Sequence, residues 1–282
     1  MPEIARRFGT IVRATAVAFV IALAPQGVWS ALILANIKVS PRVPWAVVLM
    51  AGLLWAMWRY LGGAFPPRRT SKSRRLHLRA VRVPREVLVW AFVAGGLSII
   101  ALTGYWIVLA QFVRMPGSVL PSMANVPRSM AVLAVVTGAA ISPICEQIGI
   151  WGYGHVILSR DFRRLSVIVL SALIFAVGPH PPFGVPLLPK IAFFFLVGLT
   201  FAVTAALTGS ILPNLPVHML GLLTFFTIVW PNDPLRPLLR ESDPDLWFFV
   251  HVAQSVLFTV LALWAFRRLS EVRSLKVVLA PG

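Results

Sequence analysis

Residues 130–158, MAVLAVVTGAAISPICEQIGIWGYGHVIL, form an apolar stretch that contains one acidic residue, Glu146, and no Lys or Arg. About 20 consecutive apolar residues are enough for an α-helix to cross the hydrocarbon core of a bilayer. Inside lipid, a helix satisfies its backbone hydrogen bonds within the segment. We therefore interpret this stretch as a transmembrane helix, long enough to tilt or to re-enter the bilayer.

Further apolar stretches follow the same pattern, and the whole chain predicts an all-α transmembrane helical bundle of about eight spans. The expected spans are Ile11–Ala35, Pro44–Leu61, Val87–Val113, Met130–Leu158, Leu165–Val177, Ile191–Leu207, Ile211–Trp230 and Leu246–Phe266. Hydrophobic residues make up 58% of the sequence and charged residues 12%, which is too little polar surface for a soluble domain. We expect residues 1–282 to form a single multi-pass domain in the cell membrane.

The positive charges are clustered, and their positions predict an orientation. With eight spans, four basic clusters fall on one side of the membrane, and the acidic loop with Asp233, Glu241, Asp243 and Asp245 falls on the other. The clusters are the N-terminus (Arg6, Arg7, Arg13), the loop Arg68–Arg85, the turn Arg160–Arg164 and the tail from Arg267 to Lys276. The positive-inside rule then places both termini in the cytoplasm.

The net charge of +17 raises the question of a partner. Nucleic acid is not expected, because the cations lie at the ends of apolar segments and not along one folded face. The loop Arg68–Arg85 either only sets the topology or also binds anionic lipid headgroups. The expected partners are membrane lipid and a membrane-associated polypeptide.

Ionisable residues at membrane depth are costly and therefore candidates for function. Glu146, His180 and His218 are the best of these, whereas His155 and His251 lie nearer span ends. A carboxylate with two imidazoles can hold a water molecule, with Glu146 as the general base. The same three residues could instead ligate a divalent metal such as zinc and leave a position open for water. Structural polar contacts between helices are the third interpretation.

The local sequences around these residues resemble the CPBP family, which comprises CAAX-type endopeptidases, bacteriocin-processing proteins and abortive-infection proteins of the membrane. Residues 142–153, SPICEQIGIWGY, resemble its first motif, Pro-x-x-Glu-Glu-x-x-x-Arg-Gly, and Arg160–Arg164 supply the basic turn that follows. Residues 175–180, FAVGPH, are similar to the second motif, and 195–199, FLVGL, with 207–218, LTGSILPNLPVH, to the third. The resemblance covers roughly Met130–Phe226, the expected catalytic core.

This sequence also departs from the family pattern. Gln147 stands in place of the second Glu and Trp151 in place of the Arg, so both members of an expected ion pair are replaced. We expect Trp151 to lie against neighbouring helices and not against lipid.

Two further departures concern the histidines. His180 is the fifth residue after Phe175 where the family has the fourth, so a local bulge near Gly178 and Pro179 is expected. Leu222 replaces an Asn or Asp. Asn214, one turn before His218, is the candidate replacement, although Pro216 is expected to disturb the helix between them.

The resemblance implies an intramembrane endopeptidase that hydrolyses a membrane-associated polypeptide. Glu146 and His180 would activate water, and His218 with Asn214 would stabilise the oxyanion, which requires the first three residues to lie roughly 3–6 Å apart. A catalytically silent member that acts as a membrane scaffold or immunity-type interaction protein is the alternative. A small-solute transporter is weaker, because intramembrane charges are few and no inverted repeat is visible.

Overall fold

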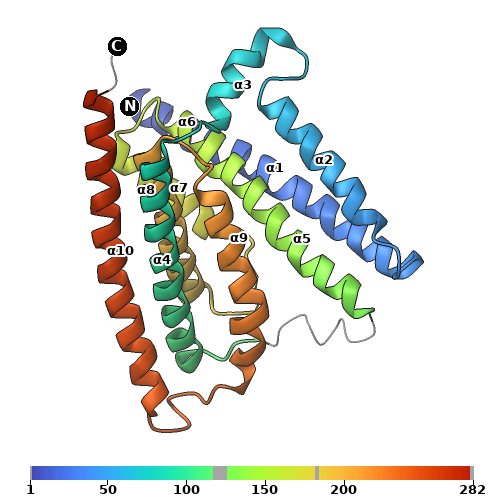
Figure 1. Ribbon diagram of the computed structural model, residues 1–282, viewed down its shortest axis with the longest axis vertical. Helices are drawn as coiled ribbons and strands as arrows, with labels where there is room; N and C mark the ends of the chain where they lie inside the picture. The colour runs from blue at the N-terminus through green and yellow to red at the C-terminus, as the bar shows by residue number, and fades with distance from the viewer. Residues whose placement is uncertain (1, 117–125, 182–183, 280–282) are drawn as a thin grey trace. The chain divides into compact units, whose positions relative to one another are not determined.

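The computed structural model describes residues 2–116, 126–181 and 184–279. All regular secondary structure in these ranges is helical (Figure 1), which confirms the all-α fold class. By length and composition, 6 helices can cross a membrane: Glu3–Val39, Arg85–Phe112, Arg128–Leu158, Leu187–Thr208, Asn214–Asp233 and Leu246–Ser274. The other two expected spans correspond to shorter apolar helices, Trp45–Leu61 and Arg164–Ala176. The count of eight spans and the side of the termini remain predictions.

The chain divides into two compact units that alternate along the sequence. Unit 1 comprises 1–81 and 119–167, and unit 2 comprises 82–118 and 168–282. Each unit is described by itself below. The single domain expected from the sequence stays a prediction.

Unit 1 is built around the long helix α1 (Pro2–Val39), which packs against α5 (Arg128–Glu146) and the π-helix η3 (Gln147–Gly154). Small residues bring these helices close together. Ala14 and Ala18 are fully buried, and a Cβ at Gly149 would lie 2.5 Å from the carbonyl oxygen of Ala18. Small residues are the usual means by which membrane helices approach closely, since lipid gives little hydrophobic drive for helix association.

The remaining helices of unit 1 are α2 (Trp45–Leu61), η1 (Arg68–Thr70), α3 (Ser71–Leu78) and α6 (His155–Leu158). Buried polar side chains fix the turns between them. Asn36 donates to the carbonyls of Ser40 and Val43, at 2.7 and 2.8 Å, and accepts from the backbone N–H of Ala46. These bonds stabilise the turn from α1 to α2, where backbone groups lack helical partners.

Arg74 has the same structural role in the basic loop. Its guanidinium is buried, donates to the carbonyls of Tyr60, Phe65 and Pro67, and lies 4.3 Å from the ring centre of Tyr60. Arg74 therefore shapes the connection from α2 to α3 and is not part of the solvent-facing charge of this loop.

Unit 2 contains α4 (Arg85–Phe112), most of α7 (Arg164–Ala176), α8 (Leu187–Thr208), α9 (Asn214–Thr224), η4 (Phe225–Val229), η5 (Trp230–Leu235) and α10 (Leu246–Leu279). Helix α10 runs alongside α4 for most of its length (Figure 1). Gly104 makes this possible, since a Cβ there would lie 2.5 Å from Oγ of Ser255 and 2.9 Å from the carbonyl oxygen of His251. Helix α4 also packs against α8 and α9.

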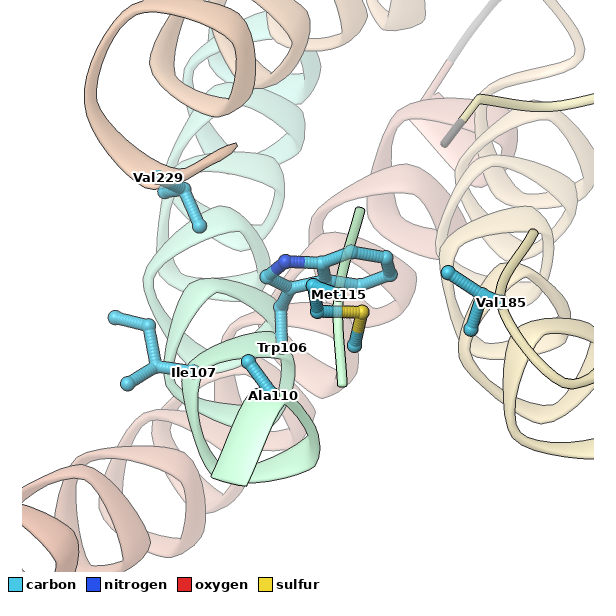
Figure 2. Packing of buried hydrophobic residues seen from close by; sticks show 6 residues of the cluster. All are labelled: Trp106, Ile107, Ala110, Met115, Val185 and Val229. Carbon is cyan, nitrogen blue, oxygen red and sulfur yellow. The ribbon is translucent and has the colours of Figure 1, made fainter. Parts of the chain in front are cut away.

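An apolar cluster at the end of α4 forms one core of unit 2 (Figure 2). Its buried members are Trp106, Ile107, Ala110, Met115, Val185 and Val229, with Trp106 at the centre. The indole N–H of Trp106 donates to the carboxylate of Asp233 at 2.6 Å. Asp233 is only 2% exposed, so this hydrogen bond offsets part of the cost of burying a polar group.

Candidate active site

Glu146 is the last residue of α5, at the point where the helix widens into η3. Its side chain is 6% exposed, and its Oε1 accepts hydrogen bonds from two neutral groups. The Ser142 hydroxyl donates at 2.7 Å from one turn earlier, and the Gln26 amide donates at 3.3 Å from α1. The carboxylate is thus held in one orientation by the contact between α1 and α5.

Gln26 is itself fixed. Its Nε2 also donates to the carbonyl of Ala22 at 2.9 Å, and its Oε1 lies 3.2 Å from the hydroxyl of Ser142. Sequence reasoning missed Gln26, because it considered only ionisable side chains. The available signal was a polar amide in the middle of an otherwise apolar span.

The π-helix η3 follows Glu146 directly, and the sequence did not predict it. Trp151 in η3 is completely buried within unit 1, which confirms that it packs against protein and not lipid. The guanidinium of Arg79, which follows α3, donates to the carbonyl of Trp151 at 2.9 Å. Position 151 carries a tryptophan where the family pattern has an arginine, but η3 is still contacted by an arginine, Arg79, from outside the helix. Such π-helical turns are frequent at functional sites.

In unit 2, His180 lies just after α7, which ends at Ala176. The backbone N–H of Gly178 donates to the carbonyl of Phe175 and that of His180 to the carbonyl of Gly178, both at 2.9 Å. The expected helical bulge is thus replaced by the end of the helix and a tight turn. The physical reason is Pro179, which has no N–H to continue the helical ladder.

The imidazole of His180 is tightly packed. It stacks on Phe194 with ring centres 4.2 Å apart and lies 4.3 Å from the ring centre of Phe175. Its Nε2 lies 2.6 Å from the carbonyl oxygen of Phe175, and since a carbonyl only accepts, Nε2 carries the hydrogen. Burial, aided by Lys190 and opposed by this hydrogen bond, lowers the pKa of His180 to about 4. The ring is therefore neutral near pH 7, and Nδ1 keeps an acceptor lone pair.

His218 lies in α9 and is 4% exposed. Its ring centre is 4.4 Å from that of Phe201 and 6.1 Å from that of Phe175. Phe175 therefore contacts both His180 and His218, and the structure brings the two histidines into one aromatic cluster. Phe194 and Phe201 belong to this cluster but had no sequence signal, because phenylalanine is frequent in every span.

Asn214 and His218 lie in the same helix, so the expectation that Pro216 disturbs the helix between them is wrong. Pro216 falls in the first turn of α9, where a backbone N–H has no helical partner in any case. The Asn214 amide donates to the carbonyl of Phe201 at 2.9 Å. Its proposed role as an oxyanion donor remains a prediction.

The described parts of the chain contain no group of three or more His, Cys, Asp and Glu side chains arranged to hold a metal ion. Unit 1 supplies Glu146 and unit 2 supplies His180 and His218, so neither unit alone provides the expected three ligands. A zinc-type site made by these residues, and the convergence of Glu146 with the histidines, stay predictions.

The chain also matches a family model. Residues 128–223 match the family described as Rce1-like, type II CAAX prenyl endopeptidase. The matched range contains Glu146, His180, Asn214 and His218. No curated protein and no solved structure matches the chain. Residues 128–223 are therefore similar to the Rce1-like type II CAAX prenyl endopeptidase family, which confirms the resemblance to the CPBP family.

Proposed function

We propose that this protein is a divergent intramembrane endopeptidase of the cell membrane that hydrolyses a membrane-associated polypeptide. The observation that carries this proposal is the fixed carboxylate of Glu146, buried at the α5–η3 junction between Ser142 and Gln26. A general base must be held where it can take a proton, and a buried carboxylate that is oriented by hydrogen bonds, in a span that matches the family, meets that requirement. The description of the matched family supports peptide hydrolysis as the reaction class.

In the proposed reaction, Glu146 takes a proton from a water molecule, and the resulting hydroxide attacks the scissile carbonyl carbon. His180 holds the attacking water through the acceptor nitrogen Nδ1, since its Nε2–H is used by Phe175. His218 donates a hydrogen bond to the developing oxyanion. Collapse of the tetrahedral intermediate breaks the C–N bond, and the proton on Glu146 passes to the leaving amine. No step requires a metal, and metal binding by Glu146, His180 and His218 remains a separate expectation.

The second candidate, a catalytically silent scaffold or immunity-type protein, is favoured by one specific set of replacements. Gln147, Trp151 and Leu222 stand where the family pattern has two charged residues and a polar donor. Loss of one oxyanion donor typically lowers a rate by about 10²–10³-fold. Leu222 is therefore the replacement that weighs most against efficient catalysis.

The test is cleavage of a fluorogenic prenylated peptide by the purified full chain in proteoliposomes. Glu146→Gln should abolish cleavage, because the amide is nearly isosteric but cannot take the proton. Glu86→Gln, the same substitution at the exposed start of α4, is the matched control and should keep wild-type activity. His180→Ala and His218→Ala should each lower the rate strongly. Cleavage that survives Glu146→Gln would refute the proposal, and no cleavage by wild type would favour the scaffold.

A further inference from the structure

Helix α1 supplies one side chain that hydrogen-bonds to Glu146, and that side chain is Gln26. The contact lies wholly within unit 1, since α1 and α5 both belong to it. The family match covers residues 128–223 and does not reach α1, so the resemblance assigns no role to Gln26. Its hydrogen bond either only joins two helices or also orients the proposed general base.

The orientation of the Gln26 amide is determined by its neighbours. The carbonyl oxygen of Ala22, 2.9 Å from Nε2, only accepts hydrogen bonds, and so does the ionised carboxylate of Glu146, at 3.3 Å. Nε2 carries two hydrogens and serves both acceptors. Exchanging the two ends of the amide would set oxygen against oxygen at both contacts. The amide oxygen is therefore turned toward Ser142, whose hydroxyl lies 3.2 Å away.

The hydroxyl of Ser142 lies between two acceptors but has one hydrogen to donate. Its oxygen is 2.7 Å from Oε1 of Glu146 and 3.2 Å from the amide oxygen of Gln26. The shorter bond goes to a charged group and is the stronger of the two. The Ser142 hydrogen therefore points to Glu146, and the hydroxyl and the Gln26 amide donate to the same carboxylate oxygen.

Close packing of α1 sets the distance over which Gln26 reaches. A Cβ at Gly149, three residues after Glu146, would lie 2.5 Å from the carbonyl oxygen of Ala18 and 3.2 Å from the backbone nitrogen of Ala22. Backbone thus meets backbone one turn before Gln26. Contacts of this kind let two membrane helices approach closely, and they hold Gln26 within reach of Glu146.

We propose that Gln26 is a positioning residue for Glu146, so that α1 contributes to the active site although it lies outside the matched region. The inference rests on the proposed endopeptidase function. Gln26 acts through the carboxylate alone, which it orients together with Ser142. Two donors that converge on one oxygen restrict rotation of the carboxylate, and a misaligned catalytic group lowers the rate of the chemical step. The turnover number kcat should therefore depend on Gln26, whereas KM should not.

The test replaces Gln26 by Met, which fills a similar volume but has no N–H to donate. Gln26→Met should lower kcat for the prenylated peptide roughly ten-fold, the size expected for one hydrogen bond to a charged group, and leave KM unchanged. The matched control is Gln254→Met, because Gln254 also donates its amide to another helix, to the carbonyl of Ile100 at 2.8 Å, but within unit 2. The control should keep the wild-type kcat. An unchanged kcat in Gln26→Met would overturn the inference while the endopeptidase stands.

A second measurement is independent of hydrolysis. Adding Glu146→Gln to each of the three proteins isolates the infrared bands of the Glu146 carboxyl group by difference. These bands should shift in Gln26→Met, because the carboxylate has lost a donor, and keep their wild-type positions in Gln254→Met. Bands that do not shift in Gln26→Met would overturn the inference even where kcat falls. A wild type that cleaves nothing, with bands that shift, would overturn the endopeptidase and keep Gln26 as the residue that orients Glu146.

Discussion

The hydroxyl of Ser142 donates to the carboxylate of Glu146 at 2.7 Å from one helical turn earlier in α5. Ser142 is the first residue of the stretch SPICEQIGIWGY, and its hydrogen bond orients the carboxylate oxygens of Glu146, the proposed general base. Neither the motif spacing nor the family pattern assigns this role to the serine.

The first prediction concerns that contact. Ser142→Ala should lower the cleavage rate about ten-fold, since a hydrogen bond to a charged group contributes roughly 1.5–3 kcal/mol. Ser142→Thr keeps the hydroxyl and should recover most of the rate. The measurement is kcat for the prenylated peptide used above. Equal rates for the alanine and threonine variants would show that the hydroxyl has no positioning role.

The second prediction concerns the turn that carries His180. A Cβ at Gly178 would lie 3.0 Å from both Nε2 of His180 and the carbonyl oxygen of Phe175, so Gly178→Ala should push apart the two partners of a hydrogen bond. We expect a loss of about 1–3 kcal/mol in stability, together with lower activity.

The control for this variant is Gly96→Ala in α4, where a Cβ would meet nothing within 4 Å. Alanine is the better helix former by about 1 kcal/mol, so this variant should be neutral or slightly stabilised. Thermal unfolding in detergent, followed by tryptophan fluorescence, measures both. A Gly178→Ala protein as stable and active as Gly96→Ala would contradict the described turn.

The third prediction concerns the buried pair Trp106 and Asp233. Trp106→Phe keeps most of the ring but removes the donor, which leaves the Asp233 carboxylate short of a hydrogen bond. The expected cost is about 1–3 kcal/mol of stability, because an unsatisfied buried acceptor loses its water without replacement. Trp247→Phe, at a side chain that is 65% exposed on α10, should have no measurable effect. Similar melting temperatures for the two variants would argue against the hydrogen bond.

The fourth prediction concerns topology. Single cysteines at Arg75 and Arg240, in a Cys145→Ser background, should react with a membrane-impermeant maleimide from opposite sides of the membrane. Position 75 should be cytoplasmic, because it lies in the most basic loop. Cys145 is fully buried, so the wild-type thiol should label poorly. Labelling of both new cysteines from the same side would require an even number of spans between them and would contradict the predicted topology.

Hydrophobicity alone was enough to predict the fold class and the positions of the helices. Every expected span corresponds to a helix, because an apolar segment in lipid has few other ways to satisfy its backbone. The motifs around Glu146, His180 and His218, taken together and in order, were sufficient to predict the family resemblance. Helices α2 and α7 are shorter than the other apolar helices, so hydrophobicity alone does not establish that they cross the membrane. The count of eight spans therefore stays a prediction, which the cysteine labelling tests.

The sequence by itself determined which side chains are candidates, since Glu146, His180 and His218 are conspicuous among apolar neighbours. Only the tertiary structure decided what surrounds them. Gln26 reaches Glu146 because α1 packs closely on α5 and η3 over alanine and glycine, and His180 meets Phe194 because the chain turns back after Pro179. Such contacts join residues far apart in the chain, and local sequence patterns carry no information about which distant side chains will meet.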